Sequence, residues 1–336
     1  MDADHLVDVV RGNIVESEHW GHIAVVNSEG EVLYSKGNPN KVTFARSSMK
    51  PLQAIPIVET GAADTYQLEP ADLSLACASH SGEDQHTDRV KTILNKLGLT
   101  TESLKCGTHP PRWQETYERL MKSGTEITAE YNNCSGKHSG MLTTAIHMGE
   151  SLEDYYKTDH PVQKRIIEVI SDLTETPVDE IEIGIDGCGV PVHGIPLKNL
   201  AFGFAKMANP VSQPEKRKNA IEQVTSAMMA APEMVGGTDR FCSDFMRIEE
   251  GRMFGKAGAE GVYCIGDLET GLGIAIKIED GNGRATSPVA VEVLKQLGLL
   301  TEEQDELLKE YHYPSLKNAR QEVIGQIRPV FSLKNA

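Results

Sequence analysis

The 336-residue chain carries 49 acidic residues against 33 lysines and arginines, a formal net charge of −16. This balance argues against a nucleic-acid or anionic-membrane partner, because both need clustered lysine and arginine. With 39% hydrophobic and 24% charged residues, the composition is that of a globular protein that buries a substantial core in one large domain or two intimate ones.

The first residues offer no secretory leader. Residues 1–5 are acidic and polar, and no apolar run approaches the length of a membrane span. We therefore expect a cytoplasmic protein, in which cysteines serve first as core residues and next as metal ligands or reactive thiols. The six cysteines are scattered over Cys77, Cys106, Cys134, Cys188, Cys242 and Cys264.

The N-terminal half begins with a hairpin pattern and continues with helices. Residues 22–27 and 31–35 flank the turn Ser28-Glu29-Gly30, which predicts a β-hairpin. Residues 180–185 alternate again and indicate a strand. Between them, apolar spacing predicts helices over residues 52–58, 87–97, 114–122, 141–147 and 161–173.

The C-terminal half returns to strands. Helices are predicted over residues 197–207, 214–231, 287–297 and 302–311, and short strands over 253–257, 261–266 and 273–278. Strands at both ends with helices between favour an α+β fold, a mixed sheet of N- and C-terminal strands with an inserted, mostly helical region. We interpret residues 1–336 as a single catalytic unit, with an α/β part over 1–50 and 180–336 and a mostly helical part over 51–179.

The stretch Ser47-Ser48-Met49-Lys50 carries the clearest chemical signal. Residues three apart share one face of a helix turn, so Ser47 and Lys50 can act as nucleophile and base. Such a Ser-x-x-Lys opens the motif set of penicillin-recognising enzymes, which a later Lys-x-Gly completes, here Lys256-Ala257-Gly258. Pro51 is tolerated only in a first turn, so the helix should begin at Ser47 or Ser48.

Three further loops concentrate small, polar and reactive side chains at the ends of regular elements, where scaffold-held sites usually lie. A structural interpretation is open for each of them: Ser79 as a helix cap, Cys134 as a buried thiol in a turn, and Cys188 as a small core residue. The loops are Ala78-Ser79-His80-Ser81-Gly82-Glu83, Asn132-Asn133-Cys134-Ser135-Gly136-Lys137-His138-Ser139-Gly140 and Asp186-Gly187-Cys188-Gly189-Val190-Pro191-Val192-His193.

With these motifs, in this order over residues 46–261, the chain resembles the rhizobial-type, or structural class 3, L-asparaginases. The resemblance implies a fold similar to serine β-lactamases and glutaminases, a homodimer, and hydrolysis of L-asparagine to L-aspartate and ammonia. The matching segments are residues 46–50, 76–83, 132–138, 186–191 and 256–261.

Carried over onto this chain, the resemblance implies two serine–lysine pairs, Ser47 with Lys50 and Ser79 with Lys256. It places a Zn²⁺ site on Cys134, Lys137 and Cys188. The residues alone would instead suggest a cysteine–histidine site that includes His138 and His193. Arg46, His80, Asp186 and His138 are the expected substrate-binding residues, with Asp186 and His138 beside the metal and Arg46 a candidate anchor for a substrate carboxylate.

The chemistry requires a neutral lysine. A free lysine has a pKa of ~10.4, so neutrality at pH 7 means a shift of ~3 units, or ~4–5 kcal/mol. Burial and a nearby cation both act in that direction, so Lys50 and Lys256 in one cleft would keep each other neutral. We expect Ser47 to attack the amide, because Lys50 is fixed within one turn of it, and we expect zinc to support substrate binding rather than supply the nucleophile.

Other functions stay open at this point. A β-lactamase or penicillin-binding protein would need a Ser-Asp-Asn motif, which does not occur between the two lysine motifs. A non-catalytic zinc-stabilised binding protein would use the cysteines for structure alone. Glutaminase activity also stays open, because glutamine is longer than asparagine by one methylene, and a pocket can discriminate against one methylene by only ~1–3 kcal/mol.

Overall fold

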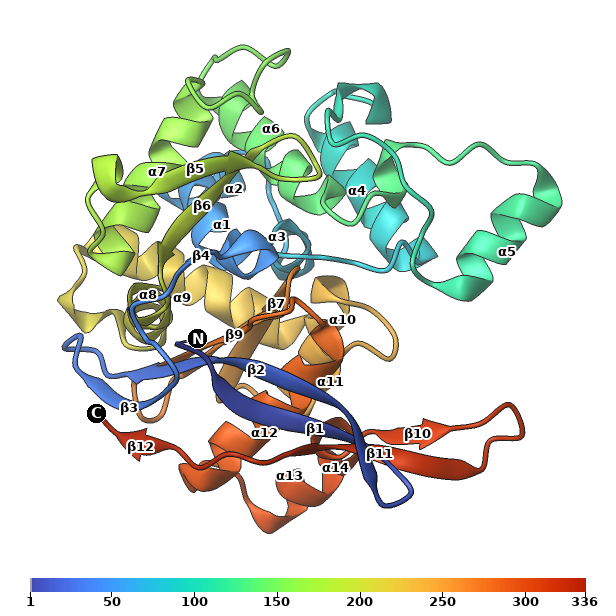
Figure 1. Cartoon of the computed structure of the whole chain (residues 1–336). Helices are drawn as coiled ribbons and strands as arrows, with labels where there is room; N and C mark the ends of the chain where they lie inside the picture. The colour runs from blue at the N-terminus through green and yellow to red at the C-terminus, as the bar shows by residue number, and fades with distance from the viewer. Residues whose placement is uncertain (1) are drawn as a thin grey trace.

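The structure, a computed structural model, describes residues 2–336 and combines two antiparallel sheets with a helical layer (Figure 1). The large sheet has the order β10-β11-β1-β2-β9-β8-β7, with β3 paired to β2 and β12. Its strands are β1 Asp4–Arg11, β2 Ile14–Val26, β3 Val32–Lys36, β7 Met253–Gly258, β8 Val262–Asp267, β9 Leu272–Ile278, β10 Ser315–Lys317, β11 Val323–Pro329 and β12 Lys334–Asn335. The small sheet, of order β4-β6-β5, consists of β4 Val42–Phe44, β5 Glu182–Ile185 and β6 Pro191–Pro196.

Helices fill the stretch between the two groups of strands and continue beyond it. The α-helices are α1 Lys50–Glu59, α2 Ala62–Thr65, α3 Pro70–Ala76, α4 Asp84–Lys96, α5 Gln114–Ser123, α6 Ser135–His147, α7 Pro161–Thr174, α8 Leu197–Ala208, α9 Glu215–Ala230, α10 Pro232–Val235, α11 Phe241–Ile248, α12 Thr286–Gln296, α13 Glu302–Leu307 and α14 Lys309–His312. Short 3-10 turns are η1 Arg46–Met49, η2 Thr101–Ser103, η3 Ala129–Tyr131, η4 Val178–Glu180, η5 Pro210–Ser212 and η6 Gly283–Ala285. No helix of residues 2–336 is both long enough and apolar enough to cross a membrane.

The large sheet lies between helices α8 and α12 (Figure 1). Helix α8 packs closely because Gly273 on β9 has no side chain: a Cβ there would lie 1.9 Å from the carbonyl oxygen of Ala201. On the far side of α8, the buried helix α1 packs against α3, α6, α7 and α9. This arrangement places the start of α1 beside the edge strand β7, where the candidate site lies.

The α+β arrangement expected from the sequence is what the structure shows: strands from both ends of the chain share one sheet. The hairpin predicted around residues 28–30 is β2 and β3, paired in antiparallel register. The helix predicted over residues 302–311 is instead two short helices, α13 and α14. The division of the chain into sub-regions remains an interpretation.

Several strands escaped the sequence analysis. Strand β1 contains Asp4 and Asp8, residues that are depleted in strands, and its pattern is interrupted where irregular register occurs at residues 5–7 and 9–10. Its partner β11 carries Gly325 and Pro329, which usually indicate turns. Both are strands because the register with neighbouring strands supplies their hydrogen bonds.

Candidate active site

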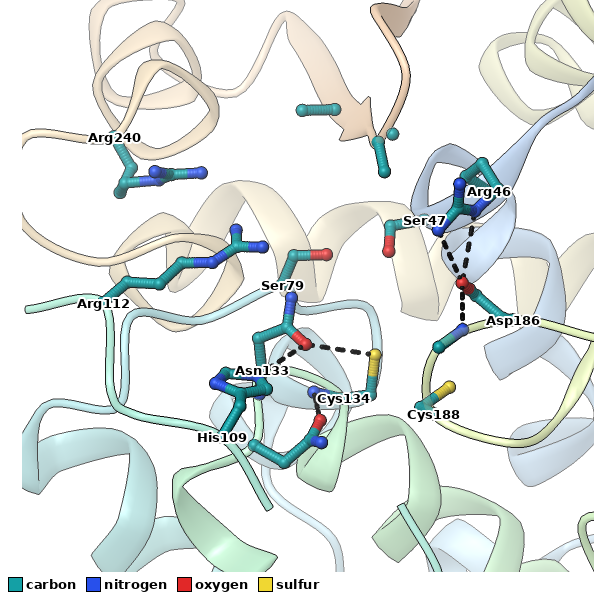
Figure 2. A pocket seen from close by; sticks show the side chains of 15 residues that line it. Arg46, Ser47, Ser79, His109, Arg112, Asn133, Cys134, Asp186, Cys188 and Arg240 are labelled. Atoms are coloured by element: carbon teal, nitrogen blue, oxygen red, sulfur yellow. Dashed lines mark hydrogen bonds and ion pairs between the residues drawn. The ribbon is translucent and has the colours of Figure 1, made fainter. Parts of the chain in front are cut away.

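A cavity of about 290 Å³ lies between the end of β7 and the loops of the helical region (Figure 2). It gathers side chains from segments that are far apart in the sequence. Its lining residues are Arg46, Ser47, Ser79, His109, Arg112, Asn132, Asn133, Cys134, Asp186, Gly187, Cys188, Arg240, Ala257, Gly258 and Ala259. All the motifs singled out in the sequence therefore contribute to one wall or another of a single cavity.

Ser47 lies on a turn that joins β4 to α1. Arg46 has φ 52, in the left-handed region that non-glycine residues seldom adopt, and such strain often accompanies functional positions. The turn η1 begins at Arg46, and α1 follows from Lys50 with Pro51 in its first turn, where no N–H is required. Pro51 lies in the first turn of the α-helix, as expected, but this helix begins at Lys50 and not at Ser47 or Ser48, because residues 46–49 form the 3-10 turn η1.

Ser79 is the hydroxyl that both lysines contact. Lys50 Nζ lies 3.1 Å and Lys256 Nζ lies 3.0 Å from Ser79 Oγ. The expected pairing of Lys50 with Ser47 is absent from the hydrogen bonds of residues 2–336. Lys50 is directed across the fold to Ser79, the carbonyl of Ala78 and the thiol of Cys134. The two predicted pairs therefore share one serine.

Burial lowers the basicity of both lysines. The side chains of Lys50 and Lys256 are each 1% exposed. Burial, assisted by the charge of Lys50, lowers the pKa of Lys256 to about 7, although the nearby thiol of Cys242 opposes the shift. Burial also lowers the pKa of Lys50. At neutral pH a large fraction of Lys256 is thus neutral and able to accept a proton.

Next to Ser79, Lys50 and Lys256, two thiols and a further amine lie close together. Cys134 is the residue directly before α6 and Lys137 lies one turn further on, so both are on one face of the helix. Cys188, in the turn between β5 and β6, lies 3.1 Å from Lys137 Nζ. All three side chains are buried. Two sulfurs and one nitrogen are donor types that suit zinc.

The two thiols differ in their electrostatics, because the hydrogen bond with Cys134 and burial raise the pKa of Cys188 above its usual value. The hydrogen bond from Cys188 and the amines of Lys50 and Lys137 hold the pKa of Cys134 well below its usual value, which favours a thiolate. Burial opposes the charge of Lys137, but the cysteines more than offset it and raise its pKa. Within residues 2–336, no further histidine, cysteine or carboxylate completes a three-ligand group with these thiols. A metal held here would need the Lys137 amine.

Arg46 and Asp186 pair with each other on the cavity wall. Arg46 donates from Nη2 and Nε to Asp186 Oδ1 at 2.9 and 3.2 Å, and the Gly187 N–H donates to the same oxygen at 2.8 Å. Burial alone would raise the pKa of Asp186, but Lys137 and Arg46 outweigh it and hold this pKa below its usual range. Asp186 is therefore a fixed anion, and Arg46 is already paired.

His80 and His138 do not line the cavity, so the direct substrate contacts expected of them do not fit their location. Both rings are fully buried. His80 donates to Ser135 Oγ at 2.9 Å and stacks on His86, while Tyr155 donates to Nδ1 of His138 at 2.7 Å. His80 and His138 instead pack behind the loops that carry Ser79 and Cys134 and support these loops.

His109, Arg112 and Arg240 also line the cavity and were not expected from the sequence. Asn133 donates its backbone N–H to His109 Nε2 at 3.0 Å, which ties the loop before α5 to the loop before α6. Arg112 and Arg240 direct their side chains into the cavity on the same side as Ser79 (Figure 2). No periodic pattern marks these residues. Their only signal is polar character next to proline or glycine, as in Pro110-Pro111-Arg112 and Gly236-Gly237-Thr238-Asp239-Arg240.

Among solved structures, the chain is similar to a β-lactamase from Mycobacterium bovis, with 14% identity, a TM-score of 0.41 and 87% of this chain and 95% of that chain covered. It is similar to the D-alanine carboxypeptidase AmpC from Burkholderia cenocepacia, with 13% identity, a TM-score of 0.42 and coverage of 82% and 93%. A penicillin-binding protein homologue from Pyrococcus abyssi, described as octameric, shows 17% identity, a TM-score of 0.40 and coverage of 83% and 73%.

Comparison with curated proteins gave no match. A family model does match: that of L-asparaginase II, over residues 7–329. The match spans nearly the whole chain and includes every residue of the cavity wall. The chain therefore belongs to the L-asparaginase II family, and it is an amidohydrolase.

Proposed function

We propose that this protein hydrolyses the side-chain amide of L-asparagine through an ester on a serine, with Lys50 and Lys256 as the proton acceptors. The observation that carries the proposal is the contact of both lysines with Ser79 Oγ, at 3.1 and 3.0 Å, on the wall of the cavity. A hydroxyl flanked by two buried amines of lowered pKa can give up or pass on a proton near neutral pH.

We assign the attack to Ser47 and the proton transfer to Ser79. Ser47 lies in the first turn of a helical segment, where backbone N–H groups have no partner within the helix. Such a group can stabilise the negative oxygen that forms on the amide carbon. Ser79, held between two amines, is suited to pass the proton of Ser47 to a neutral lysine.

Strand β7 ends beside a second N–H group for that oxygen, in the turn that follows the strand. It is the edge strand of the large sheet, and its Ala257 N–H points away from β8, to Cys242 Sγ at 3.2 Å. Ala259 lies in the turn directly after β7 and lines the cavity together with Ser47. Gly258 lets this end approach the Ser47 turn, since a Cβ there would lie 2.6 Å from the carbonyl oxygen of Ala45. We therefore propose Ser47 and Ala259 as the donors of the oxyanion hole.

The proton and bond changes balance as follows. Ser47 Oγ bonds to the amide carbon while its proton passes through Ser79 to a neutral lysine. The lysine returns that proton to the nitrogen, the C–N bond breaks and ammonia leaves. Water then attacks the ester, its proton follows the same path, and aspartate is released with Ser47 restored. Asp186, an anion on the cavity wall, is placed to bind the α-ammonium group of the substrate.

We further propose that Cys134, Lys137 and Cys188 hold a Zn²⁺ ion, as their donor atoms and burial suit. Bound there, zinc would supply positive charge that orders the cavity wall beside the substrate; two thiolates make it a weak Lewis acid. Lys137 must be neutral to act as a ligand. The residues themselves keep Cys134 anionic and hold Lys50 against it, at 3.2 Å.

Direct attack by Ser79 is the second candidate, and the lysine contacts favour it. It needs no relay, because the serine already contacts its bases. The amide chemistry and the substrate are the same in both cases. Replacement of Ser47 by alanine separates them, since only the second candidate still forms an ester in that variant.

We also propose that the protein works in the cytoplasm as a homodimer. All six cysteines are free and buried, as expected in a reducing compartment. Light scattering on the purified chain tests the dimer, and fractionation of the source cells tests the compartment.

An ammonia-release assay tests the function directly. We expect release from L-asparagine that exceeds release from L-glutamine, and a loss of at least ~100-fold in Lys50→Met and Lys256→Met. Lys122→Met is the matched control, because Lys122 is exposed on α5. Equal turnover of the two lysine variants and the wild type would refute the proposed chemistry.

A further inference from the structure

Two arginines on the cavity wall have no partner in the structure. Arg112 precedes α5 and Arg240 precedes α11, and both line the cavity with Ser79 (Figure 2). Within residues 2–336, neither guanidinium makes a hydrogen bond or an ion pair. Every other arginine of these residues donates to a carboxylate or, for Arg284, to a histidine.

Two arginines without a carboxylate partner are unexpected in a chain with 49 acidic residues against 33 lysines and arginines. Burial and the neighbouring charge of Arg240 lower the pKa of Arg112, so the two cations disfavour each other in this position. An anion between them would remove that repulsion and satisfy the planar donor groups, which suit a carboxylate.

The charges on the cavity wall indicate which anionic group would bind between Arg112 and Arg240. Asparagine carries an α-ammonium and an α-carboxylate. Asp186 offers the only carboxylate on the cavity wall within residues 2–336, so it suits the ammonium group. Arg46, expected from the sequence to anchor the carboxylate, is already held by Asp186 at 2.9 Å. The unpaired arginines lie on the other side of the cavity (Figure 2).

We propose that Arg112 and Arg240 bind the α-carboxylate of the substrate and thereby restrict the enzyme to amides of α-amino acids. The inference rests on the proposed function, since the ligand is its substrate. Simple amides that lack this carboxylate would enter the cavity but would not be held in register with Ser47 and Ser79.

Three substrates isolate the contribution of each charge. L-asparagine has both groups, 3-aminopropanamide lacks the carboxylate, and succinamate lacks the ammonium. Ammonia release should show that Arg112→Gln and Arg240→Gln lower kcat/KM for asparagine and succinamate by roughly 10- to 100-fold, chiefly through KM. The rate with 3-aminopropanamide should stay unchanged, and lysine at either position should restore part of the loss.

Matched controls are exposed arginines on the same elements. Arg119→Gln on α5 and Arg247→Gln on α11 remove a surface charge near each arginine and should leave all three substrates unaffected. Thermal melting confirms that each variant is folded. An equal loss with 3-aminopropanamide, or no loss with asparagine, would overturn the carboxylate assignment.

A binding measurement keeps the inference separate from the proposed reaction. Calorimetric titration of L-aspartate into the wild type should give binding that weakens by roughly 10- to 100-fold in each glutamine variant. If the wild type releases no ammonia from asparagine but this pattern holds, the reaction is wrong and the carboxylate site stands. If aspartate does not bind to the wild type, or binds to the variants equally well, the site itself is refuted.

Discussion

Lys50 and Lys256 reach the same atom, Ser79 Oγ, from two neighbouring elements, at 3.1 and 3.0 Å. Lys50 comes from the first turn of α1, and Lys256 from the edge strand β7. Because each is buried beside the other, their charges cannot both be accommodated at low cost. Two adjacent buried lysines therefore have an effect that one lysine would not have: the charge of each favours the neutral form of the other.

The first prediction concerns pH. Burial brings the pKa of Lys256 to about 7, and the proposed reaction needs its neutral form. As pH falls below 7, Lys256 gains its proton and kcat/KM for asparagine should fall about tenfold per pH unit. Above this value the rate should level off. Steady-state kinetics from about pH 5 to about pH 9 checks the profile, and a flat profile across pH 7 would exclude Lys256 as the base.

A second prediction concerns stability. The pKa of Lys256 is lower in the folded chain than in the unfolded one, so the unfolded chain binds more protons between about pH 7 and the ordinary lysine pKa of ~10.4. Stability from this group therefore rises with pH across that window and is lowest below it. Lys256→Met removes the buried amine and should raise Tm at pH 7 by ~2–6 °C while abolishing activity.

Scanning calorimetry measures this effect. The exposed Lys122→Met variant serves as the control and should leave Tm unchanged. A Tm of Lys256→Met below that of the wild type would mean that the hydrogen bonds of Lys256 to Ser79 and the Ala257 carbonyl outweigh the cost of burying the amine.

A third prediction concerns the metal. Elemental analysis of the purified protein should find one zinc per chain, and Cys134→Ser and Cys188→Ser should lose most of it. Cys264→Ala, a buried cysteine on β8, should retain the metal. Chelation should raise KM for asparagine more than it lowers kcat. A loss of kcat at unchanged substrate affinity would argue that zinc takes part in the chemical step.

Asp186 provides a fourth prediction. Two contacts from Arg46 and one from the Gly187 N–H fix its carboxylate on the cavity wall. Asp186→Asn should raise KM for asparagine by roughly 10-fold or more, because the α-ammonium loses its counter-ion, while succinamate, which lacks that group, is turned over as before. Asp179→Asn, an exposed position nearby in the sequence, is the control. An equal effect on both substrates would show that Asp186 holds the cavity rather than the ammonium group.

The loops that are rich in reactive side chains could be assigned to the site from the sequence, but the contacts between their side chains could not be predicted. Ser47, Ser79, Cys134 and Cys188 all line the same cavity, as their loop positions indicated. The partner of Lys50 was not predictable, because the spacing of Ser-x-x-Lys describes one helix turn only. A tertiary contact with Ser79, 29 residues away, decides where the amine is directed.

Arg112 and Arg240 illustrate the same limit from the other side. Each follows a proline- or glycine-containing loop with no periodic pattern, and either could be an ordinary surface arginine by sequence. Their role can be inferred only from the structure, in which both line one cavity and neither guanidinium has a partner within residues 2–336. His80 shows the reverse case: it stands next to Ser79 in the chain, yet its ring points into the packing behind it, against His86.

The most direct test is to identify the serine that carries the acyl group. Rapid quenching of the enzyme with L-asparagine, followed by digestion and peptide mass analysis, should find a β-aspartyl ester on Ser47. In Ser79→Ala the same ester should form at least ~100-fold more slowly, because its proton has lost the path to the lysines. An ester on Ser79, or ester formation at the wild-type rate in Ser79→Ala, would contradict the assignment of attack to Ser47 and proton transfer to Ser79.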